Sequence, residues 1–307
     1  MQSANYVKQG PAREVLQVGE QPTPEPGPGE VRVHLKTSGV NPSDWKSRSG
    51  RTASMSAPLI IPHSDGAGDI DRVGPGVANR VGERVWIWNG QWRRPHGTAA
   101  EYIVLPSAQA VPLPERISYA EGACFGIPAL TALQAIHLAE LSPTSTVMIV
   151  GGAGSVAHYA IQFAKIRGAR VVTTVSGPEK AAHARRAGAD EVINYRTENV
   201  GQRVKTLTNG HGVDALIELD LSTNGKDYPN ILRPHATVVV YGSSNESTLP
   251  TLWLMRNSIT LRLFLVYDLT ASDRDACLAE LGALLQSNRL IHTVGRSLPL
   301  HDIAFGT

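Results

Sequence analysis

One segment, residues 146–176, constrains the fold of this chain more than any other. It opens with the apolar run TVMIV, which is typical of a strand buried on both faces. The run leads into Gly151, Gly152 and Gly154, and a stretch with helical periodicity follows. Gly154 would let the backbone approach a pyrophosphate, and Ala157 is small enough for close packing of helix on strand. Inside a complete βαβ unit, this pattern predicts dinucleotide binding rather than a plain connection.

Strand and helix patterns continue to alternate through the second half of the chain. Apolar runs and helical stretches follow one another as they do in a doubly wound parallel sheet, so we expect an α/β fold. The expected strands lie at 171–175, 213–219, 236–242 and 259–266, and the expected helices at 156–167, 179–187 and 273–287.

The first part of the chain, up to about residue 120, has a different pattern. Its apolar segments are short, and most are separated by Gly, Pro or Asn. One of them, VRVHLKTSGV, alternates apolar and polar residues as a half-buried strand does. These features predict a β-rich, barrel-like or sandwich-like domain with strands at 31–40, 67–73, 84–88 and 100–105.

The end of the second expected strand indicates which nucleotide would bind. NAD sites usually carry an acid there, which bonds the ribose hydroxyls. Here Ser176 follows the strand, no acid occurs before Glu179, and Lys180 comes next. A hydroxyl and a cation suit the 2′-phosphate of NADP, because charge-assisted hydrogen bonds to phosphate are strong. We interpret the nearby Arg185 and Arg186 as a solvated helix face.

Composition argues against several other classes of function. The 29 Lys and Arg residues nearly balance the 27 Asp and Glu residues, so we do not expect nucleic acid or an anionic membrane as a partner. The two cysteines, Cys124 and Cys277, are too few for a disulfide scaffold or a cysteine-rich zinc site, and fit a reducing cytoplasm. We see no apolar signal-peptide region and no run near the roughly 20 residues of a spanning helix, so we expect a cytoplasmic protein.

Motifs for metal binding or nucleophilic catalysis are missing from the sequence. The ten histidines include no H-x-x-x-H or H-E-x-x-H pair, and there is no C-x-x-C or G-x-S-x-G. His63, Ser64 and Asp65 superficially suggest a triad, but neighbours in sequence point their side chains in different directions. The residues alone therefore predict an enzyme without a bound metal.

Taken in order along the chain, several motifs resemble those of the medium-chain dehydrogenase/reductase superfamily. Within it, they are similar to the zinc-free NADPH:quinone oxidoreductases of the zeta-crystallin type. The resemblance covers nearly the whole chain. It rests on the glycine turn and on GVNPSDWKSRSG (39–50), PHSDGAGDIDRVGPGV (62–77), VGERVW (81–86), GTAAEYIVLP (97–106), GIPALTAL (126–133) and INYRTE (193–198).

This resemblance implies a split arrangement of two domains. Residues 1–123 and 268–307 would form a GroES-like catalytic domain, and residues 124–267 a Rossmann domain that binds NADPH. Relatives continue beyond PLHDIAFGT with a helix and a closing strand, so we expect the C-terminal part of the catalytic domain to be shortened. Relatives also dimerise through the edge strand of the Rossmann sheet, and we expect a homodimer here.

Position by position, the resemblance also implies a site. The residues under the pyrophosphate would be Gly151, Gly154, Ser155 and Val156. Those at the 2′-phosphate would be Ser176, Lys180 and Tyr195, and those toward the nicotinamide end Gly242, Ser243, Leu263 and Val266. Asn41, Asp44 and Thr131 would line the nicotinamide and ribose pocket and orient the reacting groups, with no proton donor assigned.

Several positions differ from related enzymes. Zinc-dependent members have a ligand cysteine where this chain has Asn41 and a ligand histidine where it has Ser64, which agrees with a metal-free site. Lys46 replaces a tyrosine found over the active site in several relatives, and Trp45 could supply the aromatic wall of the substrate pocket instead. Enoyl-thioester reductases carry a proton-donating tyrosine shortly after this motif, and residues 51–57 contain none.

Three functional hypotheses follow. The first is an NADPH-dependent reductase that transfers hydride to a quinone in a water-poor cleft, where catalysis is mostly positioning. The second is an NADPH-dependent reductase of activated C=C bonds in an enal, enone or enoyl thioester. The third is an NADPH-binding protein of weak activity with a structural or RNA-contacting role, which the missing basic stripe disfavours.

Overall fold

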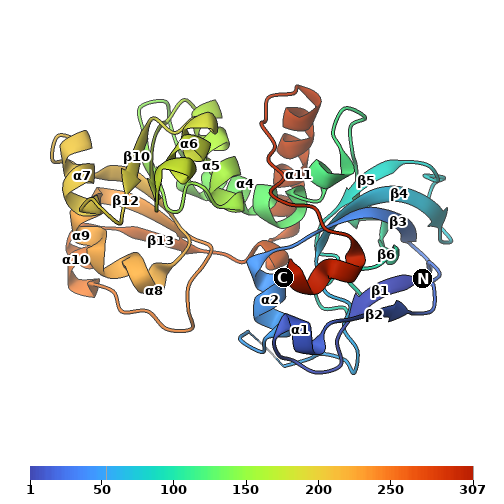
Figure 1. Cartoon of the computed structure of the whole chain (residues 1–307). Helices are drawn as coiled ribbons and strands as arrows, with labels where there is room; N and C mark the ends of the chain where they lie inside the picture. Colours follow the sequence, from blue (N-terminus) through green and yellow to red (C-terminus); the bar gives the residue numbers. More distant parts are fainter. Residues whose placement is uncertain (53, 307) are drawn as a thin grey trace. The chain divides into compact units, whose positions relative to one another are not determined.

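The computed structural model describes residues 1–52 and 54–306, and it divides into two compact units (Figure 1). The first unit contains Met1–Ile127 and the segment from His292 onward, and the second contains Pro128–Ile291. In the described part of the chain, no helix is long and apolar enough to cross a membrane.

The first unit is built on a five-stranded antiparallel sheet with the order β6-β3-β4-β5-β7. These strands are β3 (Glu30–Gly39), β4 (Asp65–Val73), β5 (Arg84–Ile87), β6 (Tyr102–Pro106) and β7 (Ala110–Pro112). A separate two-stranded sheet pairs β1 (Gln2–Asn5) with β2 (Gln17–Glu20). The short helices are α1 (Ala12–Val15), α2 (Pro42–Arg48), α3 (Tyr119–Gly122) and two 3₁₀ turns, Ser107–Gln109 and Leu300–Phe305.

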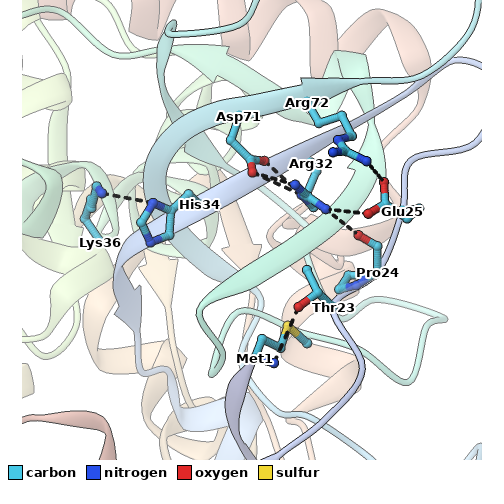
Figure 2. Close-up of polar contacts among 9 residues, drawn as sticks. All are labelled: Met1, Thr23, Pro24, Glu25, Arg32, His34, Lys36, Asp71 and Arg72. Carbon is cyan, nitrogen blue, oxygen red and sulfur yellow. Dashed lines mark hydrogen bonds and ion pairs between the residues drawn. The ribbon is translucent and has the colours of Figure 1, made fainter.

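Strand β3 shows why this sheet has two different faces. Its alternate residues Val31, Val33 and Leu35 are buried in the core with apolar residues of the neighbouring strands, as the alternation in the sequence predicts. The residues between them form the polar face that Figure 2 shows. There, Arg32 donates from Nε and Nη2 to both carboxylate oxygens of Asp71, with its shortest contact at 2.7 Å. It also contacts Glu25 at 2.9 Å, which ties the segment before β3 to the sheet.

The second unit contains a six-stranded parallel sheet with the order β10-β9-β8-β11-β12-β13, which confirms the expected doubly wound sheet. The strands are β8 (Thr146–Ile149), β9 (Arg170–Val175), β10 (Glu191–Asn194), β11 (Val213–Glu218), β12 (Leu232–Val240) and β13 (Thr260–Leu263). The strand order reverses between β8 and β11, and ligands of such sheets bind beyond the carboxyl ends of the strands at this point.

Helices precede, connect and follow the parallel strands of the second unit. A π-helical turn, Phe125–Ala129, contains Pro128 and precedes the first of them. The helices are α4 (Leu130–Ala139), α5 (Ser155–Ile166), α6 (Pro178–Arg186), α7 (Val200–Leu207), α8 (Leu221–Asn224), α9 (Tyr228–Ile231), α10 (Thr251–Arg256) and α11 (Ala271–Gln286). Two 3₁₀ turns lie at Gly225–Asp227 and Val266–Asp268.

The boundaries between the units differ from those expected. We placed the return to the first unit at residue 268, whereas α11 belongs to the second unit and the return begins at His292. The reason is packing: Cys277 of α11 is fully buried, and Glu280 contacts His137 of α4 and Arg167, each at 2.8 Å. The first unit likewise extends to Ile127, where we had expected it to end at residue 123.

A side-chain clamp fixes the point where the chain leaves the second unit. The Oε1 atom of Gln162 accepts the N–H of Ile291 at 2.7 Å, and its Nε2 donates to the carbonyl of Ile291 at 3.0 Å. His158, one turn earlier on α5, donates from Nε2 to the same carbonyl at 2.7 Å. His158 therefore has a structural role in this clamp.

Candidate active site

The glycine turn after β8 has the geometry that the sequence predicts. Gly151 has a φ of +73°, a conformation that favours glycine, and its N–H donates to Oγ1 of Thr174 at 3.1 Å. The N–H of Gly152 donates to the carbonyl of Thr174 at 2.9 Å. A Cβ on Gly152 would lie 2.3 Å from Oγ1 of the buried Thr173, so the turn passes too close to β9 for any side chain there.

Helix α5 begins directly after this turn, and its first N–H groups are available to a ligand. The first N–H groups of any helix have no acceptor inside the helix. The residue that precedes α5 is Gly154, which has no side chain to cap them, and Ser155 and Val156 form the start of the helix. Free N–H groups and the positive end of the helix dipole suit a phosphate. This end of α5 therefore fits the pyrophosphate of a dinucleotide.

A hollow of about 250 Å³ lies beside the turn, at the end of β9. It brings together the predicted Gly151, Gly154, Ser176, Lys180 and Tyr195 from the turn, from the end of β9, from α6 and from the segment after β10. Ala153, Thr174 and Val175 complete its lining, which contains no carboxylate. The residues that the sequence assigned to a 2′-phosphate thus share one concave surface.

A second and larger cavity, of about 570 Å³, shares Gly151, Thr174 and Tyr195 with the first. It is acidic, with four carboxylates in its lining: Glu198, Glu218, Asp220 and Asp227. Glu218, at the end of β11, is fully buried, and burial raises its pKa. Sequence reasoning missed this cavity, although two acids at the end of a buried strand could have indicated it.

The other predicted nucleotide contacts lie outside both hollows. Gly242 and Ser243 follow β12, Leu263 ends β13, and Val266 begins a 3₁₀ turn. Thr131 lies on α4, where it is buried, and its Oγ1 has no hydrogen-bond partner among the described residues. The roles assigned to these residues remain predictions.

In the first unit, Asn41 and Asp44 form the start of α2. Both side chains are buried, and the Oδ2 atom of Asp44 accepts the N–H of Asn41 at 2.7 Å. Burial raises the pKa of Asp44 to about 7, and the Asn41 N–H opposes this shift only in part. Trp45 and Lys46 follow on the same helix, and the guanidinium of Arg51 lies 4.9 Å from the centre of the Trp45 ring.

The raised pKa of Asp44 predicts how stability depends on pH. The unfolded chain releases this proton near pH 4, but the folded chain releases it only near pH 7, so the group costs stability as pH rises through this interval. Asp44→Asn does not titrate and keeps an oxygen that can accept the Asn41 N–H. We expect the unfolding free energy of the variant, relative to wild type, to increase by on the order of 2–4 kcal/mol between pH 4 and pH 8. Denaturant titrations at both pH values measure this difference, and a difference independent of pH would contradict the assignment.

Comparisons with known proteins place the chain among dehydrogenases and reductases. Residues 27–115 match the alcohol dehydrogenase GroES-like domain, and residues 155–283 match the family described as zinc-binding dehydrogenase. A quinone oxidoreductase of Pseudomonas aeruginosa is 33% identical over 234 residues, which cover 76% of this chain and 70% of that protein. A 2-haloacrylate reductase of a Burkholderia species is 30% identical over 226 residues, which cover 72% of this chain and 67% of that protein.

Solved structures give the same result. The quinone oxidoreductase of Pseudomonas syringae pv. tomato DC3000 aligns with a TM-score of 0.86 at 29% identity, covering 99% of this chain and 94% of that one. The Escherichia coli quinone oxidoreductase in complex with NADPH aligns with a TM-score of 0.83 at 26% identity, with coverages of 99% and 94%. A structure described as an NAD-dependent alcohol dehydrogenase aligns with a TM-score of 0.89 at 30% identity, with coverages of 100% and 95%.

The parallel sheet, the glycine turn and the antiparallel GroES-like unit define an oxidoreductase that uses a nicotinamide dinucleotide. More particularly, the chain belongs to the medium-chain dehydrogenase/reductase superfamily, among its quinone oxidoreductases. The resemblance seen in the motifs is thereby confirmed, together with the expected fold class.

Proposed function

We propose that this enzyme reduces quinones with NADPH and without a bound metal ion. The observation that carries the NADPH assignment is the lining of the hollow at the end of β9. Ser176, Lys180 and Tyr195 offer hydroxyl and ammonium donors on this surface, and no carboxylate is present to repel a 2′-phosphate. A carboxylate at this position would instead favour the unmodified ribose of NAD.

Two residues support metal independence. Asn41 and Ser64 occupy the positions where zinc-dependent members of the superfamily carry a cysteine and a histidine ligand. The Nδ2 atom of Asn41 is engaged in a hydrogen bond to Asp65 at 2.8 Å, and Ser64 offers only a buried hydroxyl. Neither group is a usual zinc ligand. Within residues 1–52 and 54–306, no three His, Cys, Asp or Glu side chains are arranged to hold a metal ion.

The reduced nicotinamide, when bound, supplies a hydride to the acceptor. A quinone is already electrophilic and needs no Lewis acid, and the oxygen of the reduced product can take its proton from water. We therefore assign Asn41, Asp44 and Thr131 to the orientation of reacting groups rather than to proton transfer. Trp45 and Lys46 are our candidates for walls of the substrate pocket.

Reduction of an activated C=C bond is the second candidate. The similarity to a 2-haloacrylate reductase favours it, because that protein is named for an unsaturated substrate. The same nucleotide site would serve both reactions, but reduction of a C=C bond also requires a proton at carbon. Residues 51–57, which follow α2, contain no tyrosine that could donate this proton.

We also propose a cytoplasmic homodimer. Strand β13 forms one edge of the parallel sheet, so its outer backbone groups have no neighbouring strand within the sheet. Leu263 and Leu265 at this edge are 64% and 51% exposed, which is apolar surface that a second copy could cover.

Initial rates of NADPH oxidation with two acceptors test the proposed reaction. We expect an ortho-quinone to be reduced faster than an α,β-unsaturated ketone. We also expect elemental analysis of the active protein to find far less than one zinc ion per chain. Faster reduction of the ketone would favour the second candidate. Stoichiometric zinc, or loss of activity with a chelator, would contradict metal independence.

A further inference from the structure

Asp65, the first residue of β4, is a buried carboxyl group that the assignments above leave without a role. Its side chain has no solvent exposure. The Oδ2 atom accepts two hydrogen bonds, one from Nδ2 of Asn41 at 2.8 Å and one from the N–H of Ile127 at 3.0 Å. The carboxyl group therefore joins the start of α2 to the π-helical turn that precedes α4.

These bonds determine which atom Asn41 can offer to a ligand. Its Nδ2 group is committed to Asp65, and its backbone N–H is committed to Asp44 at 2.7 Å. Burial raises the pKa of Asp65, but its Oδ2 atom already accepts the N–H of Ile127, so rotation of the Asn41 amide by 180° would place a second acceptor against this oxygen. The carbonyl oxygen Oδ1 is consequently the atom that Asn41 directs away from Asp65, and it faces the backbone N–H of Asp44 in the capping box that begins α2.

A chain of hydrogen-bonded hydroxyl groups holds the backbone carbonyl of Asp65, and each hydroxyl group in it donates toward Asp65. Thr98 donates from Oγ1 to the carbonyl of Asp65 at 2.6 Å, so Ser38 must donate to Thr98, at 2.9 Å. Ser38 then has no hydrogen left, and the Nδ1 atom of His63 donates to it at 2.9 Å. His63 therefore carries a hydrogen on Nδ1, and burial lowers the pKa of its imidazole to about 4.

The side chain of Asp65 is also confined by its packing. A Cβ on Gly126 would lie 2.2 Å from Oδ1 of Asp65 and 2.6 Å from the carbonyl of Ile87, so the carboxyl group fits against backbone on this side. A group held from several directions has little freedom to change its rotamer. Asp65 can orient Asn41 only if its own side chain is fixed in this way.

We propose that Asp65 is a positioning residue, which orients the carboxamide of Asn41 for the reaction. This inference rests on the proposed function, since it assumes that Asn41 contacts substrate or cofactor. Asp65 itself lies behind Asn41 and acts only through it. If Asp65 had a purely structural role, its replacement would lower the stability of the protein. The effect of that replacement on kcat would then be the same whether or not Asn41 is present.

A double-mutant cycle tests this role. Asp65→Ala should lower kcat about 10- to 100-fold while the NADPH dissociation constant, measured by fluorescence titration, changes less than threefold. Asp65→Asn keeps an oxygen that can accept from Asn41 and Ile127, and should restore most of the lost rate. In an Asn41→Ala background, Asp65→Ala should lower kcat by less than a further factor of three. As a matched control, Asp69→Ala removes a carboxyl group of the same strand that is bonded to Tyr119 rather than to Asn41, and should leave kcat unchanged.

Three outcomes would overturn the proposal. They are an unchanged kcat in Asp65→Ala, an equal loss from Asp65→Ala with and without Asn41, and an Asp65→Asn variant as slow as Asp65→Ala. If Asp65→Ala does not fold, Asp65→Ser keeps a polar side chain while removing the carboxyl group and is used in the same cycle. Each rate is measured with whichever acceptor the wild type reduces faster. If that acceptor is the ketone, the proposed quinone reduction is contradicted, but the same cycle still tests whether Asp65 acts through Asn41.

Discussion

Replacing Lys180 by alanine should weaken NADPH binding about tenfold and leave NADH binding within a factor of two. The expected loss, about 1.5 kcal/mol, is the low end for a hydrogen bond to a charged group. The low end applies because Lys180 is exposed and water and salt screen its charge. Calorimetric or fluorescence titrations with both nucleotides measure the effect, which should shrink as salt is added.

The control for this experiment lies one and a half turns further along α6. Arg185 is also an exposed cation, but it does not line the hollow. Arg185→Ala should therefore change the affinity for NADPH less than twofold. Equal losses for NADPH and NADH in Lys180→Ala, or equal effects of the two substitutions, would show that Lys180 does not contact the 2′-phosphate.

A methyl group added at Gly152 should lower both stability and nucleotide affinity. The new Cβ would lie 2.3 Å from Oγ1 of Thr173, so the glycine turn or Thr173 must move. Thr173 donates from Oγ1 to the carbonyl of Ile149 at 2.5 Å, and its rotation would break this buried bond. We expect Gly152→Ala to lose about 1–3 kcal/mol of unfolding free energy, as overpacked cores do, and to bind NADPH at least tenfold more weakly.

Gly177 provides the matched substitution. It lies at the start of α6, close in sequence to Ser176, and a Cβ there would meet no atom within 4 Å. Gly177→Ala should therefore be as stable as the wild type within about 0.5 kcal/mol. Denaturant unfolding of the two variants compares them directly, and an equally stable Gly152→Ala would contradict the close approach of the turn to β9.

Local patterns in the sequence were sufficient to predict the glycine turn and most of the predicted residues that line the hollow at the end of β9. The turn at Gly151 and Gly154 depends on residues close together in the chain, where backbone conformation and helix polarity follow from residue type. Ser176 and Lys180 could be placed because they directly follow a recognisable strand. Tyr195 came only from the resemblance, since β10 was not expected as a strand and nothing local places that tyrosine beside Lys180.

Features that depend on distant contacts could not be predicted in this way. The carboxyl group of Asp65 acquires its role from Asn41 and Ile127, which are 24 and 62 residues away in sequence. Likewise, nothing in the sequence of α11 indicates which unit it packs on, because its place in the second unit depends on distant contacts such as that of Glu280 with His137. The acidic cavity collects residues from several strands and helices for the same reason.

The most direct test of this account is the ratio of kcat/KM for NADPH to that for NADH, with an ortho-quinone as the common acceptor. The donors around the hollow at the end of β9, and the lack of a carboxylate in its lining, predict a ratio of at least ten in favour of NADPH. Equal values, or a preference for NADH, would contradict the assignment of Ser176, Lys180 and Tyr195 to a 2′-phosphate.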